Sequence, residues 1–204
     1  MIKLRIIKED KVNNNSEDKI IYYSENEMQF SLVNVMASNV SELDISQFSL
    51  FKYADGLRLI GRFKLSERYF KSIDIRKIPK EFRPDFYLYF GMLYYDSRRD
   101  DLATKYFKKS IKYGIENTMP YNFLATIYMS KEKIDDAIEV LLMGASVKGD
   151  TDELYYNLST CFAIKGNFTL AIEYINKCLE LDNEYPNAIN LKNDFEECLI
   201  LQNT

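Results

Sequence analysis

A pattern that returns every 34 residues limits how this chain can fold more than any other feature of its sequence. The aligned positions hold alanine or large apolar and aromatic side chains: Ala103, Ala137 and Ala171; Tyr87, Tyr121 and Tyr155; Phe90, Leu124 and Leu158; Tyr94, Tyr128 and Phe162. Three copies in one register indicate a repeat architecture, in which each unit buries its apolar face by stacking on its neighbours.

Each copy has the pattern of two helices joined by a tight turn. In the clearest copy, 155–181, apolar residues recur at helical spacing, and Gly166 and Asn167 interrupt them before a second helical pattern begins. A fourth, more degenerate copy lies upstream after an offset of three residues, with Leu50 and Ser66 at two of the recurring positions. The sequence therefore predicts four helix pairs.

Spacing and residue types together resemble the tetratricopeptide-repeat family. The resemblance divides the chain into an N-terminal segment (1–46), a repeat region 47–185 with four repeats (47–80, 84–117, 118–151 and 152–185), and a C-terminal capping helix (186–204). It implies an all-α fold, a right-handed superhelical array of antiparallel helix pairs. Cys178 stands where the family has a small residue, whereas no copy keeps the family's proline near its end.

The N-terminal segment, 1–46, does not follow the repeat. Apolar and basic residues alternate over 2–6, which is typical of a strand, and 19–23 suits a returning strand. Residues 24–27 match a helix-start capping box, and an apolar helical face follows over 28–36. We therefore expect a short β-hairpin followed by a helix.

The composition argues against an enzyme. The 204 residues include no histidine, the commonest general base near neutral pH and the commonest metal ligand. Cys161, Cys178 and Cys198 are too scattered to form a zinc site without histidine, and the sequence has no Gly-rich phosphate loop. We predict no catalytic residue, no cofactor, no metal site and no small-molecule substrate.

Charge and hydropathy narrow the partners and the location. No apolar run reaches the roughly 18 residues of a membrane span, and the first residues lack a signal-peptide core, so we expect a cytoplasmic protein. A net charge of −4 argues against nucleic acid. The stretch from Arg58 to Arg83 contains nine basic and three acidic residues. The stretch from Glu132 to Glu153 contains seven acidic residues and two lysines. This asymmetry leaves open ordinary solvated faces, a head-to-tail homo-oligomer, or a partner with a complementary charge distribution.

The family resemblance also implies a partner-binding groove, because the first helix of each pair lines the concave face in that family. The candidate groove residues are Phe48, Phe51, Asp55, Arg58, Leu88, Met92, Tyr95, Asn122, Thr126, Met129, Tyr156 and Thr160. The same rule places Glu153 on this face. Aromatic and methionine side chains suit a hydrophobic peptide or an amphipathic helix. The Lys, Asn and Arg clamp with which some family members hold a peptide carboxylate is missing.

The sequence thus predicts a protein–protein interaction scaffold that binds another protein or peptide segment. Two alternatives stay open. One is a chaperone that shields a secreted or membrane-destined client, and the other is a regulatory sensor with a displaceable N-terminal segment. The chain's own residues 30–40 are a further candidate for covering the groove.

Overall fold

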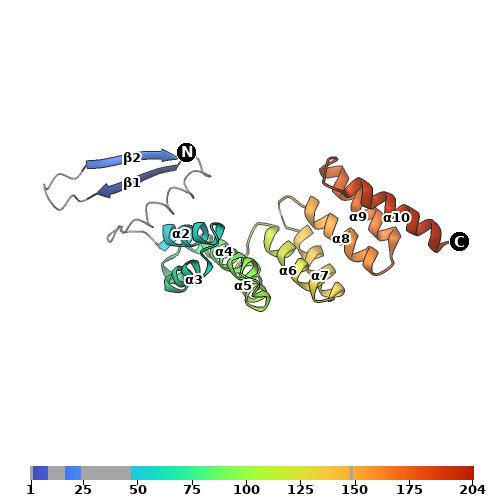
Figure 1. Ribbon diagram of the computed structural model, residues 1–204, viewed down its shortest axis with the longest axis horizontal. Coiled ribbons are helices and arrows are strands. Elements are labelled where there is room, and N and C mark those ends of the chain that lie inside the picture. Colours follow the sequence, from blue (N-terminus) through green and yellow to red (C-terminus); the bar gives the residue numbers. More distant parts are fainter. Residues whose placement is uncertain (1, 9–16, 24–46, 148) are drawn as a thin grey trace. The chain divides into compact units, whose positions relative to one another are not determined.

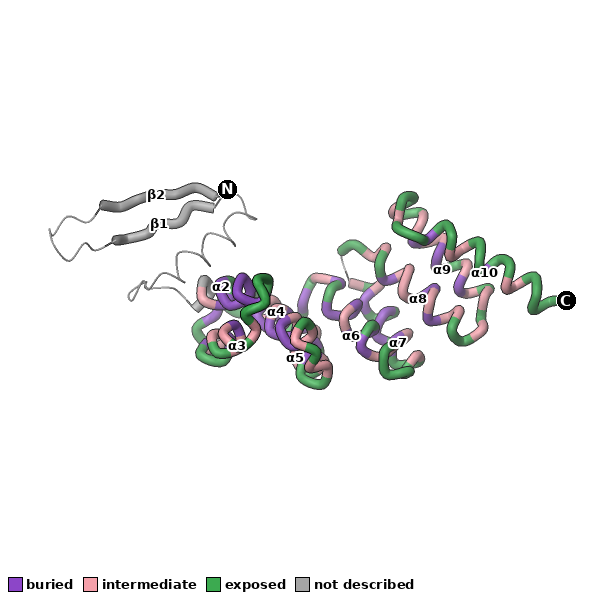
Figure 2. Tube along the Cα trace, in the orientation of Figure 1, coloured by how far each residue is buried: buried purple, intermediate pink, exposed green. Residues whose placement is uncertain are grey.

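The computed structural model describes residues 2–8, 17–23, 47–147 and 149–204 (Figure 1). It divides into two compact units, Met1–Arg99 (unit 1) and Asp100–Thr204 (unit 2). Figure 2 shows buried residues on helices of both units. Each unit therefore has a core of its own.

Unit 1 begins with a two-stranded antiparallel sheet. Strand β1 (Ile2–Lys8) pairs with β2 (Glu17–Tyr23), with Ile2 opposite Tyr23 and Lys8 opposite Glu17. β1 includes the strand expected over 2–6, and β2 includes the returning strand expected over 19–23. The helix expected over 28–36 lies outside the described residues.

The helices of unit 1 are α2 (Gln47–Leu59), α3 (Phe63–Ser72) and α4 (Arg83–Asp96), with short 3-10 turns η1 (Ile75–Lys77) and η2 (Lys80–Phe82) before α4. Gly61 makes the turn between α2 and α3 with φ +74°, a conformation that glycine adopts at little cost. Ser66 is fully buried, and its hydroxyl donates to the Ala54 carbonyl at 2.6 Å. This bond explains why a small polar residue replaces alanine in the degenerate first copy.

Aromatic rings fill the core of unit 1. Phe70 stacks on Phe90 with 4.8 Å between ring centroids, and Phe51 meets the edge of Phe86 at 6.2 Å. All four side chains are at most 4% exposed. Such ring pairs contribute about 0.5–1.5 kcal/mol beyond the burial of their area, so they join α2, α3 and α4 firmly.

Unit 2 consists of α5 (Asp100–Lys112), α6 (Met119–Ser130), α7 (Ile134–Ala145), α8 (Asp152–Ile164), α9 (Phe168–Leu181) and α10 (Ala188–Gln202). The turn between α8 and α9 is the one expected from the sequence. Gly166 has φ +73°, and the Asn167 side chain accepts a hydrogen bond from the Leu170 amide at 3.1 Å. The side chain thereby caps the first turn of α9.

Small residues bring the helices of unit 2 into close contact. Ala137 and Ala171 are fully buried. At Gly144, an added Cβ would lie 2.8 Å from the Cβ of Tyr121, closer than packing allows. The recurring alanines of the sequence are thus explained by the approach of neighbouring helices rather than by helix propensity alone.

The predicted all-α fold class is confirmed for the described residues from Gln47 onward. The helix pairs α2/α3, α6/α7 and α8/α9 fall within the predicted repeats 47–80, 118–151 and 152–185. The number of four repeats and their limits stay predictions. In α10, Phe195 is buried, whereas Ile189 is 55% exposed, because six residues place it about 120° from Phe195 around the helix.

Candidate protein-binding surface

A chain of side-chain hydrogen bonds joins α6 to α8 in unit 2. The buried Asn122 donates from Nδ2 to Glu153 Oε2 at 3.1 Å, and its Oδ1 accepts from Asn157 Nδ2 at 3.2 Å. Burial, and then repulsion from Asp152, raises the pKa of Glu153. Two amides and one carboxylate therefore link the two helices.

Apolar groups flank this polar chain. Met129 and Tyr156 are half-buried, and the Tyr156 ring lies 5.0 Å from that of Tyr185, centroid to centroid. The hydroxyl of Thr126 donates to the Asn122 carbonyl at 3.0 Å, and that of Thr160 donates to the Tyr156 carbonyl at 3.2 Å. Because each hydroxyl proton is used within its own helix, a bound segment would find an acceptor oxygen and a methyl group at both threonines.

Helical spacing places these side chains on one side of α6 and one side of α8, and we call this surface the α6–α8 face. Its members are Asn122, Thr126, Met129, Glu153, Tyr156, Asn157 and Thr160. The face offers amide groups, an aromatic ring and a thioether. Such a mixture suits a polypeptide segment, which presents both backbone polar groups and apolar side chains.

The corresponding contact in unit 1, between α2 and α4, is built from full charges. Arg58 donates from Nε to Asp55 Oδ1 at 2.6 Å and from Nη1 to Asp96 Oδ2. Arg58 and Asp55 are 7% and 2% exposed. Burial disfavours the charged guanidinium, but the bonds and charges of Asp55 and Asp96 outweigh it and raise the pKa of Arg58. Burial raises the pKa of Asp55, so this carboxylate depends on Arg58 to stay ionised.

A second polar contact in unit 1 lies near the surface. Lys52 Nζ is 3.2 Å from the Tyr89 hydroxyl, to which it donates, and 4.5 Å from the centroid of the same ring. Phe51 lies behind it, with its ring centroid 6.0 Å from that of Tyr89. Half-buried Met92 and Tyr95 lie further along α4. Unit 1 thus offers a cation and aromatic rings rather than amides.

The structure places the predicted groove residues at three depths. Thr126 is exposed, and Met92, Tyr95, Met129, Tyr156 and Thr160 are half-buried. Phe51, Asp55, Arg58, Leu88 and Asn122 are buried, and their part in a partner-binding groove stays a prediction. Position along a repeat specifies a direction around the helix, and the neighbouring helix decides whether that direction is covered. The side chain of Phe48 lies outside the described ones.

Sequence reasoning missed three residues that the structure brings to these contacts, namely Lys52, Asn157 and Tyr185. For Asn157 a signal was present, because asparagine is a poor helix former and stands in the middle of a predicted helix. Nothing comparable marks Lys52 among the many lysines, or Tyr185 at the very end of the last predicted repeat.

Comparisons with known proteins agree with this geometry. Residues 152–185 match the family model of the tetratricopeptide repeat. The structure is similar to that of the MamA protein (TM-score 0.66, 19% identity, 79% of this chain and 86% of that chain). It is also similar to the C-terminal part of a TPR repeat-containing protein from Cytophaga hutchinsonii (TM-score 0.72, 14% identity, 87% and 69%).

A third similar structure is YrrB, described as a TPR protein with an unusual peptide-binding site (TM-score 0.60, 15% identity, 81% of each chain). No curated protein matches the sequence.

The fold is therefore that of a helical-repeat solenoid. More specifically, the chain contains a tetratricopeptide repeat at 152–185 and has the fold of tetratricopeptide-repeat proteins, as the sequence pattern predicts. Among the described residues, none of the helices has the length and apolar character needed to cross a membrane.

Proposed function

We propose that this protein is a protein–protein interaction scaffold that binds a segment of a partner protein on the α6–α8 face. The observation that carries the proposal is the Asn122–Glu153–Asn157 hydrogen-bond chain, which lies among Met129, Tyr156 and the two threonines. Repeat scaffolds of this class use such helix faces as extended binding surfaces. Of the groove residues predicted from the sequence, this proposal assigns binding to those on one face in unit 2.

Fixed side chains make this face favourable for binding. Asn122 is held by two partners, so it loses little further freedom when a segment binds. Asn157 uses one N–H in its bond to Asn122 and, within the described part of the chain, keeps its second N–H and its carbonyl for a ligand. An amide can donate to one peptide group and accept from the next, which suits a polypeptide backbone.

The same face indicates which side chains a partner should carry. Met129 and the Tyr156 ring offer apolar area, which contributes about 25 cal/mol per Å² when it is covered. Glu153 places a carboxylate on this face, so an acidic residue placed against it would be repelled. We expect a largely apolar, neutral or basic segment. No turnover and no cofactor are involved in this function.

The client-shielding chaperone and the regulatory sensor remain alternatives. A chaperone would lose solubility without its client, and a sensor would change the protease sensitivity of its N-terminal segment on binding. The cytoplasmic location expected from the sequence likewise stays a prediction.

The test is an affinity capture with matched variants. Met129→Lys adds a charge on the α6–α8 face, whereas Leu181→Lys adds the same charge at a side chain that is 59% exposed at the end of α9. A partner retained by the unmodified protein and by Leu181→Lys, and lost from Met129→Lys, would support the proposal. Equal retention by both variants, with circular dichroism showing intact helices, would refute it.

A further inference from the structure

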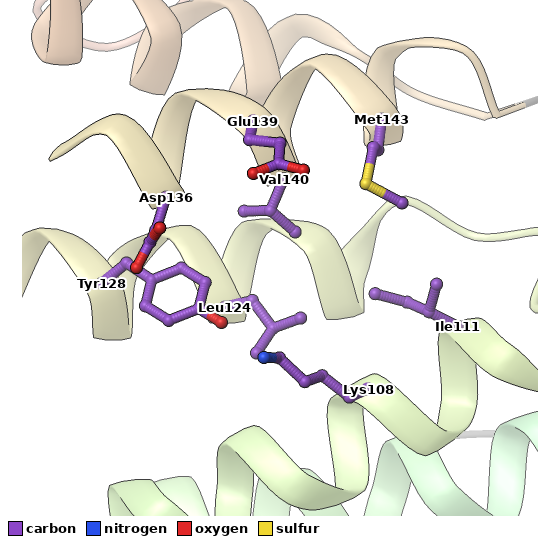
Figure 3. A pocket seen from close by; sticks show the side chains of 8 residues that line it. All are labelled: Lys108, Ile111, Leu124, Tyr128, Asp136, Glu139, Val140 and Met143. Carbon is purple, nitrogen blue, oxygen red and sulfur yellow. The ribbon is translucent and has the colours of Figure 1, made fainter. Parts of the chain in front are cut away.

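A second surface lies on the other side of α6. A cavity of about 330 Å³ opens among α5, α6 and α7, and Figure 3 shows the side chains that line it. Leu124 and Tyr128 belong to this cavity, and each is two residues from Thr126 on the α6–α8 face. Two residues correspond to about 200° around a helix, so the cavity and the α6–α8 face use opposite sides of α6. We call it the α5–α7 pocket.

The floor of the α5–α7 pocket is apolar. Leu124 and Val140 are 1% and 8% exposed, and Ile111 is half-buried beside them. Met143, in the last turns of α7, also lines the pocket although it is 49% exposed. A flexible thioether that stays in water at the mouth of an apolar cavity can cover an incoming side chain. The volume suits one large apolar side chain together with part of its backbone.

The rim of the α5–α7 pocket carries opposite charges on its two sides. Lys108 lies on the α5 side, and Asp136 and Glu139 lie on the α7 side (Figure 3). The ammonium of Lys108 is 5.6 Å from the centroid of the Tyr128 ring. Asp136 and Glu139 are exposed and about one turn apart, and neither forms an ion pair with any residue that the structure describes. By contrast, the neighbouring Asp135 pairs with Lys165.

We propose that the α5–α7 pocket binds a segment of a partner protein that carries one branched or aromatic apolar side chain followed, one helical turn later, by lysine or arginine. The apolar side chain would fill the cavity over Leu124 and Val140. The cation would then lie against Asp136 and Glu139, which have no partner within the described part of the chain. This surface is independent of the α6–α8 face, and either can bind when the other does not.

The test uses synthetic peptides and the full chain with labelled methyl groups. Three acetylated nine-residue peptides differ at two positions, i and i+3, which hold Leu and Lys, Leu and Glu, or Ala and Lys. We expect the Leu/Lys peptide to shift the methyl resonances of Ile111 and Met143 and to leave the methyl resonance of Met129 unchanged. The Leu/Glu peptide should bind about fivefold more weakly, as expected for an exposed charge pair. The Ala/Lys peptide should produce no saturable shift.

Charge reversal separates specific recognition from general attraction. Glu139→Lys should reverse the order of the two peptide affinities, so that the Leu/Glu peptide binds more tightly than the Leu/Lys peptide. Asp135→Lys makes the same change of charge on the same helix outside the pocket, and it should keep the original order. Three results would overturn the proposal: no shift of the pocket methyls at millimolar peptide, an order that Glu139→Lys leaves unchanged, or shifts confined to Met129. The last result would leave the proposed function of the α6–α8 face intact.

Discussion

The two units use different chemistry at the same kind of helix contact. Between α2 and α4 in unit 1, a guanidinium lies between two carboxylates and is almost completely buried. Between α6 and α8 in unit 2, two asparagine amides and one partly solvated carboxylate form the link. A buried ion pair is costly to open because each charge then lacks a partner. An amide can exchange one neutral partner for another at much lower cost.

This difference separates a contact that stabilises from a contact that can bind. Arg58 has both of its carboxylate partners in place and little exposed surface to offer. Asn157 is half-buried, and Thr126 beside it is exposed. We therefore assign the charged contact of unit 1 to stability and the amide contact of unit 2 to recognition. The following predictions test that assignment, from the largest expected effect to the smallest.

Removing the buried guanidinium should have the largest effect. Arg58→Met leaves Asp55 buried without its partner, and we expect a loss of about 3–5 kcal/mol in the free energy of unfolding. Urea denaturation followed by circular dichroism measures this loss. The double variant Asp55→Leu/Arg58→Met removes both charges and should recover most of the stability. A loss below about 1 kcal/mol in the single variant would contradict the role of the pair.

Removing the central amide of unit 2 should cost less. Asn122→Ala takes one partner from Glu153 and one from Asn157, but both of these side chains retain access to water. We expect a loss of about 1–2 kcal/mol by the same urea assay, together with a clear loss of partner binding. A variant that is as destabilised as Arg58→Met would remove the distinction between the two contacts.

Acid should affect the two units in opposite directions. Burial favours a higher pKa for Glu67, but hydrogen bonds from Lys71, Arg99 and Tyr94 outweigh it and lower the pKa below 4.5. The stability that Glu67 contributes is therefore present above pH 4.5 and is lost as the pH falls through its lowered pKa. The pKa of Glu153 is raised above 4.5. Its unfavourable contribution is relieved as the pH falls from 7 toward 4.5, because the folded state binds the proton more tightly.

Hydrogen-exchange protection of α3 and α8, measured against pH, tests these two trends. Glu67→Gln should remove the acid-induced loss in α3, and Glu153→Gln should remove the gain in α8. If both helices lose protection together and the variants make no difference, the electrostatic account of the two units is wrong.

Breaking an exposed ion pair should have the smallest effect. Lys131 Nζ lies 2.7 Å from Asp101 Oδ1, but the Asp101 side chain is 95% exposed. Solvent screens such a pair, so Asp101→Asn should produce no resolvable change in the urea midpoint. A loss of stability comparable with that of Asn122→Ala would contradict this account, because it would show that an exposed ion pair stabilises unit 2 as much as the buried amide does.

Much of the fold could be predicted from sequence because its determinants are local and periodic. Ala103, Ala137 and Ala171 recur at one spacing, and all three are fully buried where helices meet. The turn at Gly166 likewise needs a positive φ that the sequence makes visible. Such features depend on residue type and spacing alone, which a single sequence contains.

The candidate surface could be predicted only in part. Met129 and Tyr156 are half-buried, whereas Leu88 and Phe51, predicted for the same groove, are buried. The link from Arg58 to Asp96 joins residues 38 positions apart. Which side chains meet across such a distance depends on helix packing, and a helical position in a repeat does not specify it.

The central claim is that the α6–α8 face recognises a partner segment, and methionine methyl groups test it most directly. Met129 lies on this face, whereas Met143 lines the α5–α7 pocket on the other side of α6. The chain is labelled with 13C at its methionine methyls and titrated with the partner that affinity capture identifies. The account predicts a saturable shift of the Met129 resonance that is lost in Asn122→Ala. An unchanged Met129 resonance at full occupancy would contradict it.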